Sequence, residues 1–359
     1  MYRLVQRRGI IGLFCLLFVA SSVVPGWAQK DNRFEVSKNL DIFNSLLKEV
    51  EMFYVDSVDV DKTVQRGIEA MLAGLDPYTE YYPEQKTEEL SLMTTGEYGG
   101  IGSLIRQRNN EGGVMIAEPT EGMPADLAGL KPGDLILAID TIDVSKATNS
   151  RVSELLKGVP NTKMVLTIQR PGEKKPRKFE ITRKQITTPQ VTYYGVKNDS
   201  IGYIYLKAFT IKSAQEVKEA FLDLKKNHNI KSLVLDLRGN GGGVLEGAVQ
   251  IVGMFVPKGS EVLSTKGKIK QWDRTYRTST EPLDTVMPLA ILINGGTASA
   301  AEIVSGSLQD MDRAVLVGQR SFGKGLVQAP RDLPYNGKVK ITMSKYLSLI
   351  HISEPTRPR

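Results

Sequence analysis

The chain has 359 residues, and its 47 lysines and arginines against 40 aspartates and glutamates give a formal net charge of +7. It carries one cysteine, Cys15, and two histidines, His228 and His351. A single cysteine excludes an intramolecular disulfide, and two histidines so far apart exclude a helical HExxH zinc site. The length is sufficient for two or three domains with their own cores.

Residues 1–28 have the features of a secretory signal peptide. Three arginines precede an apolar run from Ile10 to Val24, and small residues follow at Gly26 and Ala28. We expect cleavage after Ala28 and export to the periplasm or cell envelope of a Gram-negative-like bacterium. An uncleaved membrane anchor is the alternative, although this apolar run is shorter than the roughly 20 residues that a membrane span needs.

Residues 347–359 have no periodicity and do not fit the sequence before them. They resemble the translation of a sequencing-library adapter, so we expect an artefact there and a gene interrupted near Tyr346. A disordered natural tail is the alternative. Without residues 1–28 and 347–359, 42 basic and 39 acidic residues remain. Because this excess is small and no basic cluster alternates with aromatic residues, we expect no nucleic-acid partner.

Residues 30–95 are predicted to form a helical N-terminal segment. Apolar residues recur at helical spacing from Leu40 to Phe53 and again from Val64 to Leu72. The Asp76-Pro77 pair then predicts a turn. The segment is too short to be more than a cap on another domain or an element through which two copies form a homodimer.

Residues 96–184 change to short strands and turns. Gly99-Gly-Ile-Gly102, at the start of a predicted strand at 101–105, and the turn at 128–134 resemble the corresponding parts of a PDZ domain. In PDZ domains a glycine-containing loop binds a peptide's terminal carboxylate through backbone N–H groups, and the peptide adds a strand to the sheet. The resemblance implies protein or peptide C-termini as partners. A structural β module with a glycine turn is the alternative.

The candidate peptide-binding residues follow from this resemblance. They are Gly99, Gly100, Ile101 and Gly102. We expect Val152 and Leu155, on the helix that faces the strand, to line a pocket for the last side chain of the peptide.

Residues 188–346 alternate between strands and helices. This order predicts an α/β layer of mostly parallel strands joined by right-handed crossovers. Active sites in such sheets lie at the carboxyl ends of strands, and two of the predicted strand ends, at 237–243 and 294–302, are rich in glycine. The first allows a dinucleotide site, but a third glycine would be needed where Val244 stands. It equally suits a loop that presents a bare N–H to an anion.

The second glycine-rich turn contains Ser299 near the start of a helix, where the helix dipole favours negative charge. A simple helix cap is the alternative function for this serine. A nucleophilic serine needs a base, and His228 lies in a polar turn more typical of a solvated side chain. Lys324, flanked by glycines and apolar residues, is suited to a lowered pKa. On a strand, Gln328 would share its face and could orient the amine.

Four motifs, at 235–240, 294–302, 308–310 and 321–328, resemble those of the carboxyl-terminal processing peptidases of family S41. The resemblance runs from about Leu40 to Tyr346, and the family's sequence continues beyond that point. Two positions depart from the family pattern. Gly241 stands where proline is usual, and Thr297 stands where serine is common.

The resemblance implies a role for each candidate active-site residue. Ser299 would be the nucleophile, Lys324 the general base and Gln328 the residue that orients it. The amides of Ala300 and Gly242 would form the oxyanion hole. No metal or organic cofactor is implied.

The expected fold is therefore a multidomain α+β and α/β chain. It consists of a helical N-terminal segment (30–95), a PDZ β-module (96–184) and a C-terminally truncated, crotonase-like α/β catalytic domain (188–346). The expected function is a Ser-Lys serine endopeptidase that cleaves exported proteins, with PDZ recognition of C-termini and adaptor proteins as further partners. A non-catalytic PDZ scaffold is the alternative, and a crotonase-type acyl-CoA enzyme is a weaker one.

Overall fold

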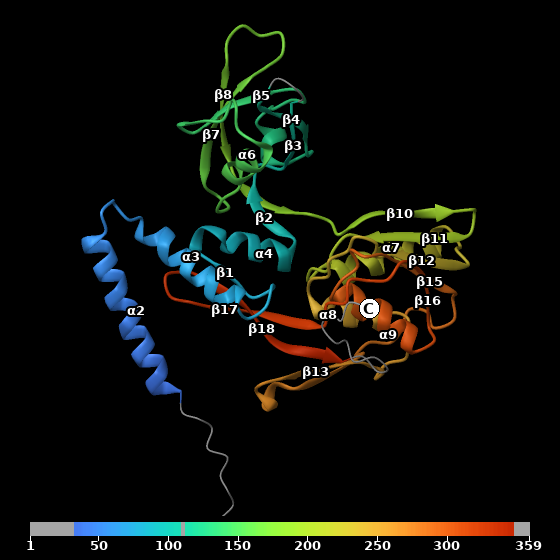
Figure 1. Cartoon of the computed structure of the whole chain (residues 1–359). Coiled ribbons are helices and arrows are strands. Elements are labelled where there is room, and N and C mark those ends of the chain that lie inside the picture. Colours follow the sequence, from blue (N-terminus) through green and yellow to red (C-terminus); the bar gives the residue numbers. More distant parts are fainter. Residues whose placement is uncertain (1–31, 109–111, 348–359) are drawn as a thin grey trace, which may run out of the picture. The chain divides into compact units, whose positions relative to one another are not determined.

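The computed structural model describes residues 32–108 and 112–347 (Figure 1). The chain divides into two compact units, Met1–Ile68 and Glu69–Arg359. The predicted signal peptide and, apart from Leu347, the predicted artefact lie outside the described residues. Within the described ranges, no helix combines the length and the apolar character that a membrane span requires.

The first unit contains α2 (Arg33–Phe53) and the start of α3 (Val60–Ala73), so helices form where the periodicity predicts them. None of the residues of α2 is buried. Most of its large apolar side chains are more than 45% exposed, among them Phe34, Leu40, Phe43, Leu46 and Phe53. Because helices in proteins are stabilised mainly by packing of an apolar face, this helix presents a surface suited to a partner.

The residues after α3 are less helical than predicted. A short strand, β1 (Glu80–Tyr82), comes before η1 (Glu84–Lys86) and α4 (Thr87–Thr95). Tyr81 and Tyr82 favour a strand, and β1 pairs antiparallel with β18 (Lys338–Leu347) near the end of the chain. Pairing with a strand far away in sequence therefore decides the structure of this segment, and a local helical periodicity cannot reveal such a partner.

The PDZ-like module follows as a six-stranded sheet, a two-stranded ribbon and two small helices. Its elements are β2 (Glu97–Gly100), β3 (Ser103–Gln107), β4 (Val114–Pro119), α5 (Pro124–Leu127), β5 (Leu135–Ile139), β6 (Ile142–Asp143), α6 (Asn149–Leu156), β7 (Lys163–Gln169), β8 (Arg177–Thr182) and β9 (Lys184–Thr187). The sheet order is β3-β4-β5-β7-β8, with β6 on β5, while β2 and β9 form a separate ribbon. Buried aliphatic residues such as Ile116, Ile136 and Leu166 form the core.

The strand predicted at 101–105 begins two residues later. Gly102 has a φ of 67°, a left-handed conformation that interrupts an extended strand. The Ile101 and Gly102 carbonyls accept hydrogen bonds from Ala125 and Thr120, respectively. The peptide segment 101–102 is therefore a bend between β2 and β3.

A buried ion pair fixes the turn before β5. Asp134 is fully buried and accepts two hydrogen bonds of 2.8 Å from the Arg170 guanidinium and one of 2.8 Å from the Lys131 N–H. Burial alone would raise the pKa of Asp134, but these hydrogen bonds outweigh it and lower the pKa below its ordinary value. The carboxylate therefore stays charged inside the module.

Replacement of Arg170 by methionine should strongly destabilise the PDZ-like module. Loss of one partner of a buried ion pair typically costs about 3–5 kcal/mol because the other charge stays buried and unpaired. Hydrogen–deuterium exchange at the amides of β5 and β7 in the whole protein measures this effect. Arg151→Met, which breaks an exposed ion pair with Glu154 in the same module, is the matched control and should cost below about 1 kcal/mol. Equal protection in both variants would contradict the prediction.

The α/β layer has the strands and helices that the sequence predicts. Its elements are β10 (Val191–Lys197), β11 (Ile201–Leu206), α7 (Ser213–Asn227), β12 (Ser232–Asp236), α8 (Leu245–Gly253), β15 (Leu289–Ile293), α9 (Ala300–Asp310) and β16 (Val315–Gly318). The sheet order is β10-β11-β12-β15-β16, in which β11, β12, β15 and β16 run parallel and β10 is antiparallel. The prediction of a mostly parallel sheet is confirmed.

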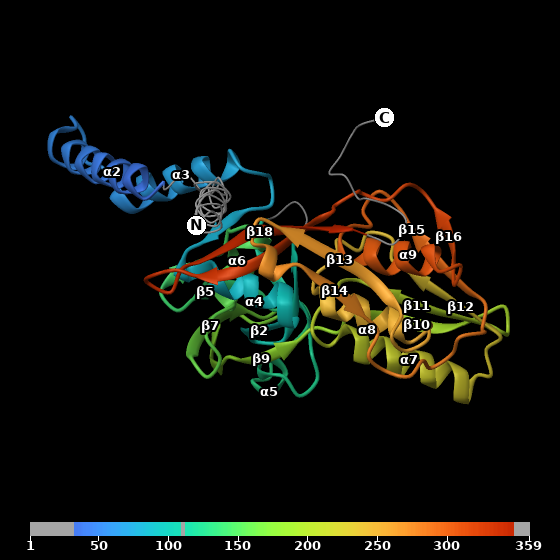
Figure 2. The ribbon, with the colours of Figure 1, turned by 90° about the horizontal axis from the view of Figure 1, so that it is seen from below.

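A second sheet, which the sequence did not predict, accompanies this layer (Figures 1 and 2). It contains β1, β13 (Glu261–Gly267), β14 (Arg274–Arg277), β17 (Leu326–Asp332) and β18, in the order β1-β18-β13-β14 with β17 on β18. A short helix, η2 (Lys270–Trp272), joins β13 and β14. The loop before β17 contains Lys324, one of the predicted site residues.

Candidate active site

Ser299 lies between the end of β15 and the first residue of α9. Its backbone angles are φ 55° and ψ −117°, a conformation that costs a residue with a side chain on the order of 1–3 kcal/mol. Ala298 and Ala300 on either side are buried. The Ser299 N–H donates a 2.8 Å hydrogen bond to Glu302 Oε2, which helps to hold the strained turn.

The glycine-rich loop at 237–243 lies directly against this serine. A Cβ atom at Gly242 would stand 2.7 Å from Ser299 Cβ and 2.9 Å from the Ala300 nitrogen, so no larger residue fits there. Asn240 joins the two loops, because its main-chain carbonyl accepts from the Ala298 N–H at 2.9 Å. The structure thus brings the predicted residues Gly242, Ser299 and Ala300 together.

The two predicted oxyanion donors differ in their hydrogen bonds. The Gly242 N–H donates to the Asn240 side-chain oxygen at 2.9 Å. Among the residues that the structure describes, no acceptor takes the Ala300 N–H, as expected for the first turn of a helix. The Ala300 N–H is therefore a free donor next to Ser299. The Gly242 N–H could act as a second donor only if its hydrogen bond to the Asn240 side chain broke.

Asp236, at the end of β12, holds the start of the glycine-rich loop. This buried carboxylate accepts hydrogen bonds from the Tyr203 hydroxyl at 2.6 Å and from both the main chain and the guanidinium of Arg238. Burial opposes its charge, but the Arg238 and Tyr203 hydrogen bonds outweigh this and lower the pKa of Asp236. The loop is thereby fixed to the sheet on the side of β12.

Lys324 lies in the loop that leads into β17. Burial lowers the pKa of its amine, and the positive charge of Lys340 lowers it further, while Glu80, Asp76 and Glu302 act in the opposite direction. The Nζ atom lies 4.3 Å from the centre of the Tyr78 ring. An amine with a lowered pKa spends more of its time neutral at a given pH, which a general base requires.

Glu302, in the first turn of α9, joins the serine and the lysine. Its Oε2 atom accepts the N–H groups of Ser299 at 2.8 Å and Lys324 at 2.9 Å. Its Oε1 atom accepts the Ser321 hydroxyl at 2.7 Å and the Gly323 N–H at 2.6 Å. One carboxylate therefore holds the main chain of both predicted catalytic residues, although they are far apart in sequence.

A second link between the two loops comes from Tyr346 on β18. Its buried hydroxyl donates to the Lys324 carbonyl and lies 3.5 Å from the Ser299 carbonyl. Burial raises the pKa of this hydroxyl far above its ordinary value, so it remains a donor. The turn of Ser299 and the loop of Lys324 thus meet at both Glu302 and Tyr346.

Gln328 does not share a strand with Lys324. β17 begins at Leu326, and a register shift between Val327 and Gln328 changes the alternation of side chains, so the expectation of a common strand face was wrong. The Gln328 amide donates to Thr342 Oγ1 at 3.2 Å. Its role as the residue that orients the lysine stays a prediction.

The candidate PDZ residues lie at the junction of the PDZ-like module with the rest of the chain. Gly99 and Gly100 belong to β2, which pairs with β9. The Gly99 N–H already donates to Glu88 Oε1 on α4 at 2.7 Å. Val152 is fully buried in the core of the module, which leaves the partly exposed Leu155 as the better candidate for contact with a peptide.

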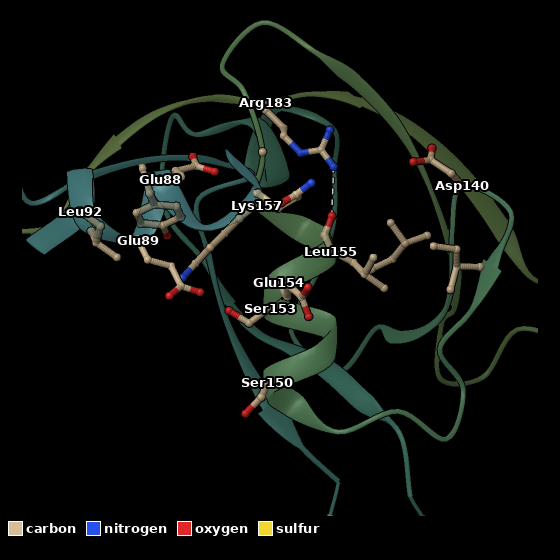
Figure 3. A pocket seen from close by; sticks show the side chains of 15 residues that line it. Glu88, Glu89, Leu92, Asp140, Ser150, Ser153, Glu154, Leu155, Lys157 and Arg183 are labelled. Atoms are coloured by element: carbon tan, nitrogen blue, oxygen red, sulfur yellow. Dashed lines mark hydrogen bonds between the residues drawn. The ribbon is translucent and has the colours of Figure 1, made fainter. Parts of the chain in front are cut away.

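A pocket of about 600 Å³ lies beside α6 and is lined from α4 by Glu88 and Glu89 (Figure 3). Arg183 is held there by hydrogen bonds to the carbonyls of Leu155 and Leu156 at the end of α6. Neither Ser299 nor Lys324 lines this pocket. The pocket therefore belongs to the PDZ-like module and α4 and not to the candidate active site.

The candidate active site contains a serine, a partly buried lysine, a free main-chain N–H and an organising carboxylate. Within residues 32–108 and 112–347, no group of three or more His, Cys, Asp or Glu side chains is arranged to hold a metal ion. A hydroxyl beside a free helix N–H suits attack on a carbonyl and binding of the resulting oxyanion. Together with the PDZ-like module, this arrangement would suit a peptidase.

Comparison with known proteins gives the family. Residues 200–353 match peptidase family S41, and residues 115–170 match the PDZ domain. The carboxy-terminal-processing protease of Bartonella bacilliformis is 35% identical over 334 residues, which are 92% of this chain and 75% of that protein. A probable CtpA-like serine protease of Staphylococcus aureus is 33% identical over 314 residues. The chain therefore belongs to the S41 family of carboxy-terminal-processing proteases with a PDZ domain.

Solved structures include two similar proteins. The photosystem II D1 C-terminal processing protease is 29% identical to this chain, with a TM-score of 0.46. The aligned region includes 84% of this chain and 81% of the photosystem II protease. A second similar structure is the PDZ domain of a carboxy-terminal protease from Vibrio cholerae in complex with peptide, which is 26% identical with a TM-score of 0.24. The aligned region includes 26% of this chain and 99% of that domain. The chain spans 61% of the length of the Staphylococcus aureus protein.

Four residues of the site were not singled out as functional from the sequence. They are Tyr78, Asn240, Glu302 and Tyr346. The Ser299-x-x-Glu302 spacing of a capping box was visible and could have identified Glu302. The contacts of Tyr78 and Tyr346 depend on pairing between distant strands, so no local pattern indicates them.

Replacement of Glu302 by glutamine should destabilise the α/β layer. The amide retains one oxygen but places an NH₂ group against two N–H or O–H donors. Each unsatisfied donor costs about 1–3 kcal/mol, so we expect a loss of about 2–6 kcal/mol. Urea unfolding followed by circular dichroism measures it. Glu246→Gln in the first turn of α8 is the control and should cost below about 1 kcal/mol. A Glu302→Gln protein as stable as this control would contradict the assigned contacts.

Proposed function

We propose that this protein is a serine endopeptidase in which Ser299 attacks the peptide bond and Lys324 is the general base. The observation that carries this proposal is the shared carboxylate of Glu302, which binds the main-chain N–H groups of both residues. The pairing of a serine with a lysine also agrees with the near absence of histidine, since His228 lies on the exposed end of α7.

The proposed reaction begins with a neutral Lys324 amine. It takes the proton of the Ser299 hydroxyl as the oxygen attacks the peptide carbonyl. The oxyanion accepts the Ala300 N–H, with Gly242 as second donor once it leaves Asn240. The lysine then protonates the departing amine, which leaves an acyl-enzyme on Ser299. Water, deprotonated by the same lysine, hydrolyses the ester and regenerates the serine.

Ser299→Ala and Lys324→Ala should each abolish cleavage of an unfolded protein in the full-length enzyme. Lys324→Arg should be equally inactive, because a guanidinium stays protonated. In the wild type, kcat/KM should rise with pH through the lowered pKa of Lys324, since only the neutral amine is a base. A Lys324→Ala enzyme with more than a few per cent of wild-type activity would refute the Ser-Lys mechanism.

The same experiment separates the enzyme from a non-catalytic PDZ scaffold. A scaffold has no need of a strained Ser299 beside a free N–H and a partly buried lysine. A fluorophosphonate probe should therefore label the wild type at Ser299 and leave Ser299→Ala unlabelled. Absence of labelling in a folded, full-length wild type would favour the scaffold.

We further propose that the PDZ module binds the C-terminus of the substrate protein. Residues 115–170 match the PDZ domain, and domains of this kind bind an extended peptide as an added strand at the sheet edge. The bend at Ile101 and Gly102, in front of β3, would supply N–H groups to the carboxylate, with Leu155 of α6 beside the last side chain. The Gly99 N–H contributes only if it is released from Glu88.

Amidation of a substrate's C-terminus should lower kcat/KM at least tenfold without a change in the bond that is cleaved. Hydrogen bonds to a carboxylate contribute roughly 1.5–3 kcal/mol each, and amidation removes the charge that strengthens them. Two substrates that differ only in this group, compared on the full-length enzyme, test the prediction. Equal values would place substrate selection in the catalytic domain instead.

We also propose where the protein acts and how two copies assemble. Residues 1–28 would direct the chain out of the cytoplasm, to the periplasm or envelope, where adaptor proteins could bind. The exposed apolar residues of α2 would pack against the same helix of a second copy, which gives a homodimer through the N-terminal segment. Substitution of Phe43 and Leu46 by serine should then yield monomers in analytical ultracentrifugation.

A further inference from the structure

The turn Asp76–Thr79, which follows α3, is tightly fixed. The Asp76 carboxylate accepts the N–H groups of Tyr78 at 2.7 Å and Thr79 at 2.8 Å, and the Thr79 hydroxyl at 2.8 Å. Burial opposes the charge of Asp76, but these hydrogen bonds lower its pKa overall. The turn also leads directly into β1, which pairs with β18. Tyr78 is therefore held by a short, rigid segment.

The Tyr78 ring contacts the functional end of Lys324. The Nζ atom lies over the face of the ring, 4.3 Å from its centre, so the two groups are in contact whether the amine is charged or neutral. A lysine side chain has four rotatable bonds, so fixing it in one arrangement costs conformational entropy. Contact with the ring face therefore favours one placement of the Nζ atom.

The same turn reaches Gln328 through Thr342. The Thr79 hydroxyl oxygen accepts the Thr342 N–H at 3.2 Å and lies 3.4 Å from the Thr342 hydroxyl. Thr342 Oγ1 in turn accepts the Gln328 amide at 3.2 Å. One turn from the N-terminal segment thus contacts both the predicted base and, through one residue, its predicted orienter.

We propose that Tyr78, fixed by the turn Asp76–Thr79, is a positioning residue that holds the Lys324 amine for proton transfer from Ser299. This inference rests on the Ser-Lys mechanism proposed above. Tyr78 exchanges no proton, and the aromatic face of its ring performs the function. The N-terminal segment would then be part of the active site as well as an element of assembly.

The test compares Tyr78→Leu with Tyr78→Phe in the full-length protein on an unfolded protein substrate. Phenylalanine retains the ring face and should keep at least half of the wild-type kcat. Leucine removes the face and should lower kcat at least tenfold while KM changes less than twofold, because substrate binding is untouched. The rate of Ser299 labelling by a fluorophosphonate should fall in parallel. Tyr194→Leu, at an exposed tyrosine on β10 away from the candidate site, is the control and should match the wild type.

The outcomes distinguish this inference from the mechanism on which it rests. If Lys324→Ala is inactive and Tyr78→Leu retains the wild-type kcat, the positioning role is refuted and the Ser-Lys mechanism stands. If Lys324→Ala is active, the mechanism itself fails. Equal losses in Tyr78→Phe and Tyr78→Leu would assign the effect to the hydroxyl and also overturn the proposal. Should thermal unfolding show that Tyr78→Leu is unfolded, Tyr78→Met replaces it as the variant without a ring.

Discussion

The candidate active site depends on one carboxylate with four hydrogen-bond donors around it. Glu302 takes two donors from the Lys324 loop through Oε1, and one each from Ser299 and Lys324 through Oε2. Because an ionised carboxylate accepts but does not donate, it is well suited to collect several N–H groups at the start of a helix. The separation of the serine and the lysine is thus set by main-chain contacts rather than by their side chains.

Close backbone approach is the second constraint on the site. Gly242 faces Ser299 and Ala300 so closely that a Cβ atom would overlap with both, and its φ of 93° also favours glycine. A similar approach occurs at Gly243, whose Cβ would lie 1.9 Å from the Phe209 carbonyl oxygen. The glycine-rich loop therefore serves to bring one backbone against another.

Sequence reasoning predicted those features that are local. Apolar runs such as 232–236 and 289–293 became the parallel strands of the layer, and the motif resemblance identified Ser299 and Lys324, which the structure places in neighbouring loops. It failed for β1 and the second sheet, whose strands pair over long sequence separations. It also failed to predict which face of the strand holds Gln328. A register shift inside β17 breaks the regular alternation of side chains, and Lys324 lies before the strand.

The pairing of β18 with both β1 and β13 has a consequence for the synthesis of the protein. β18 holds Thr342 and Tyr346, so the surroundings of Lys324 can form only after residues 338–347 have left the ribosome. Contacts of such long sequence separation form late, since the closure of a long loop must precede them. The contacts around Lys324 would thus be among the later ones to form as the chain folds, after the local pairing within the PDZ-like module.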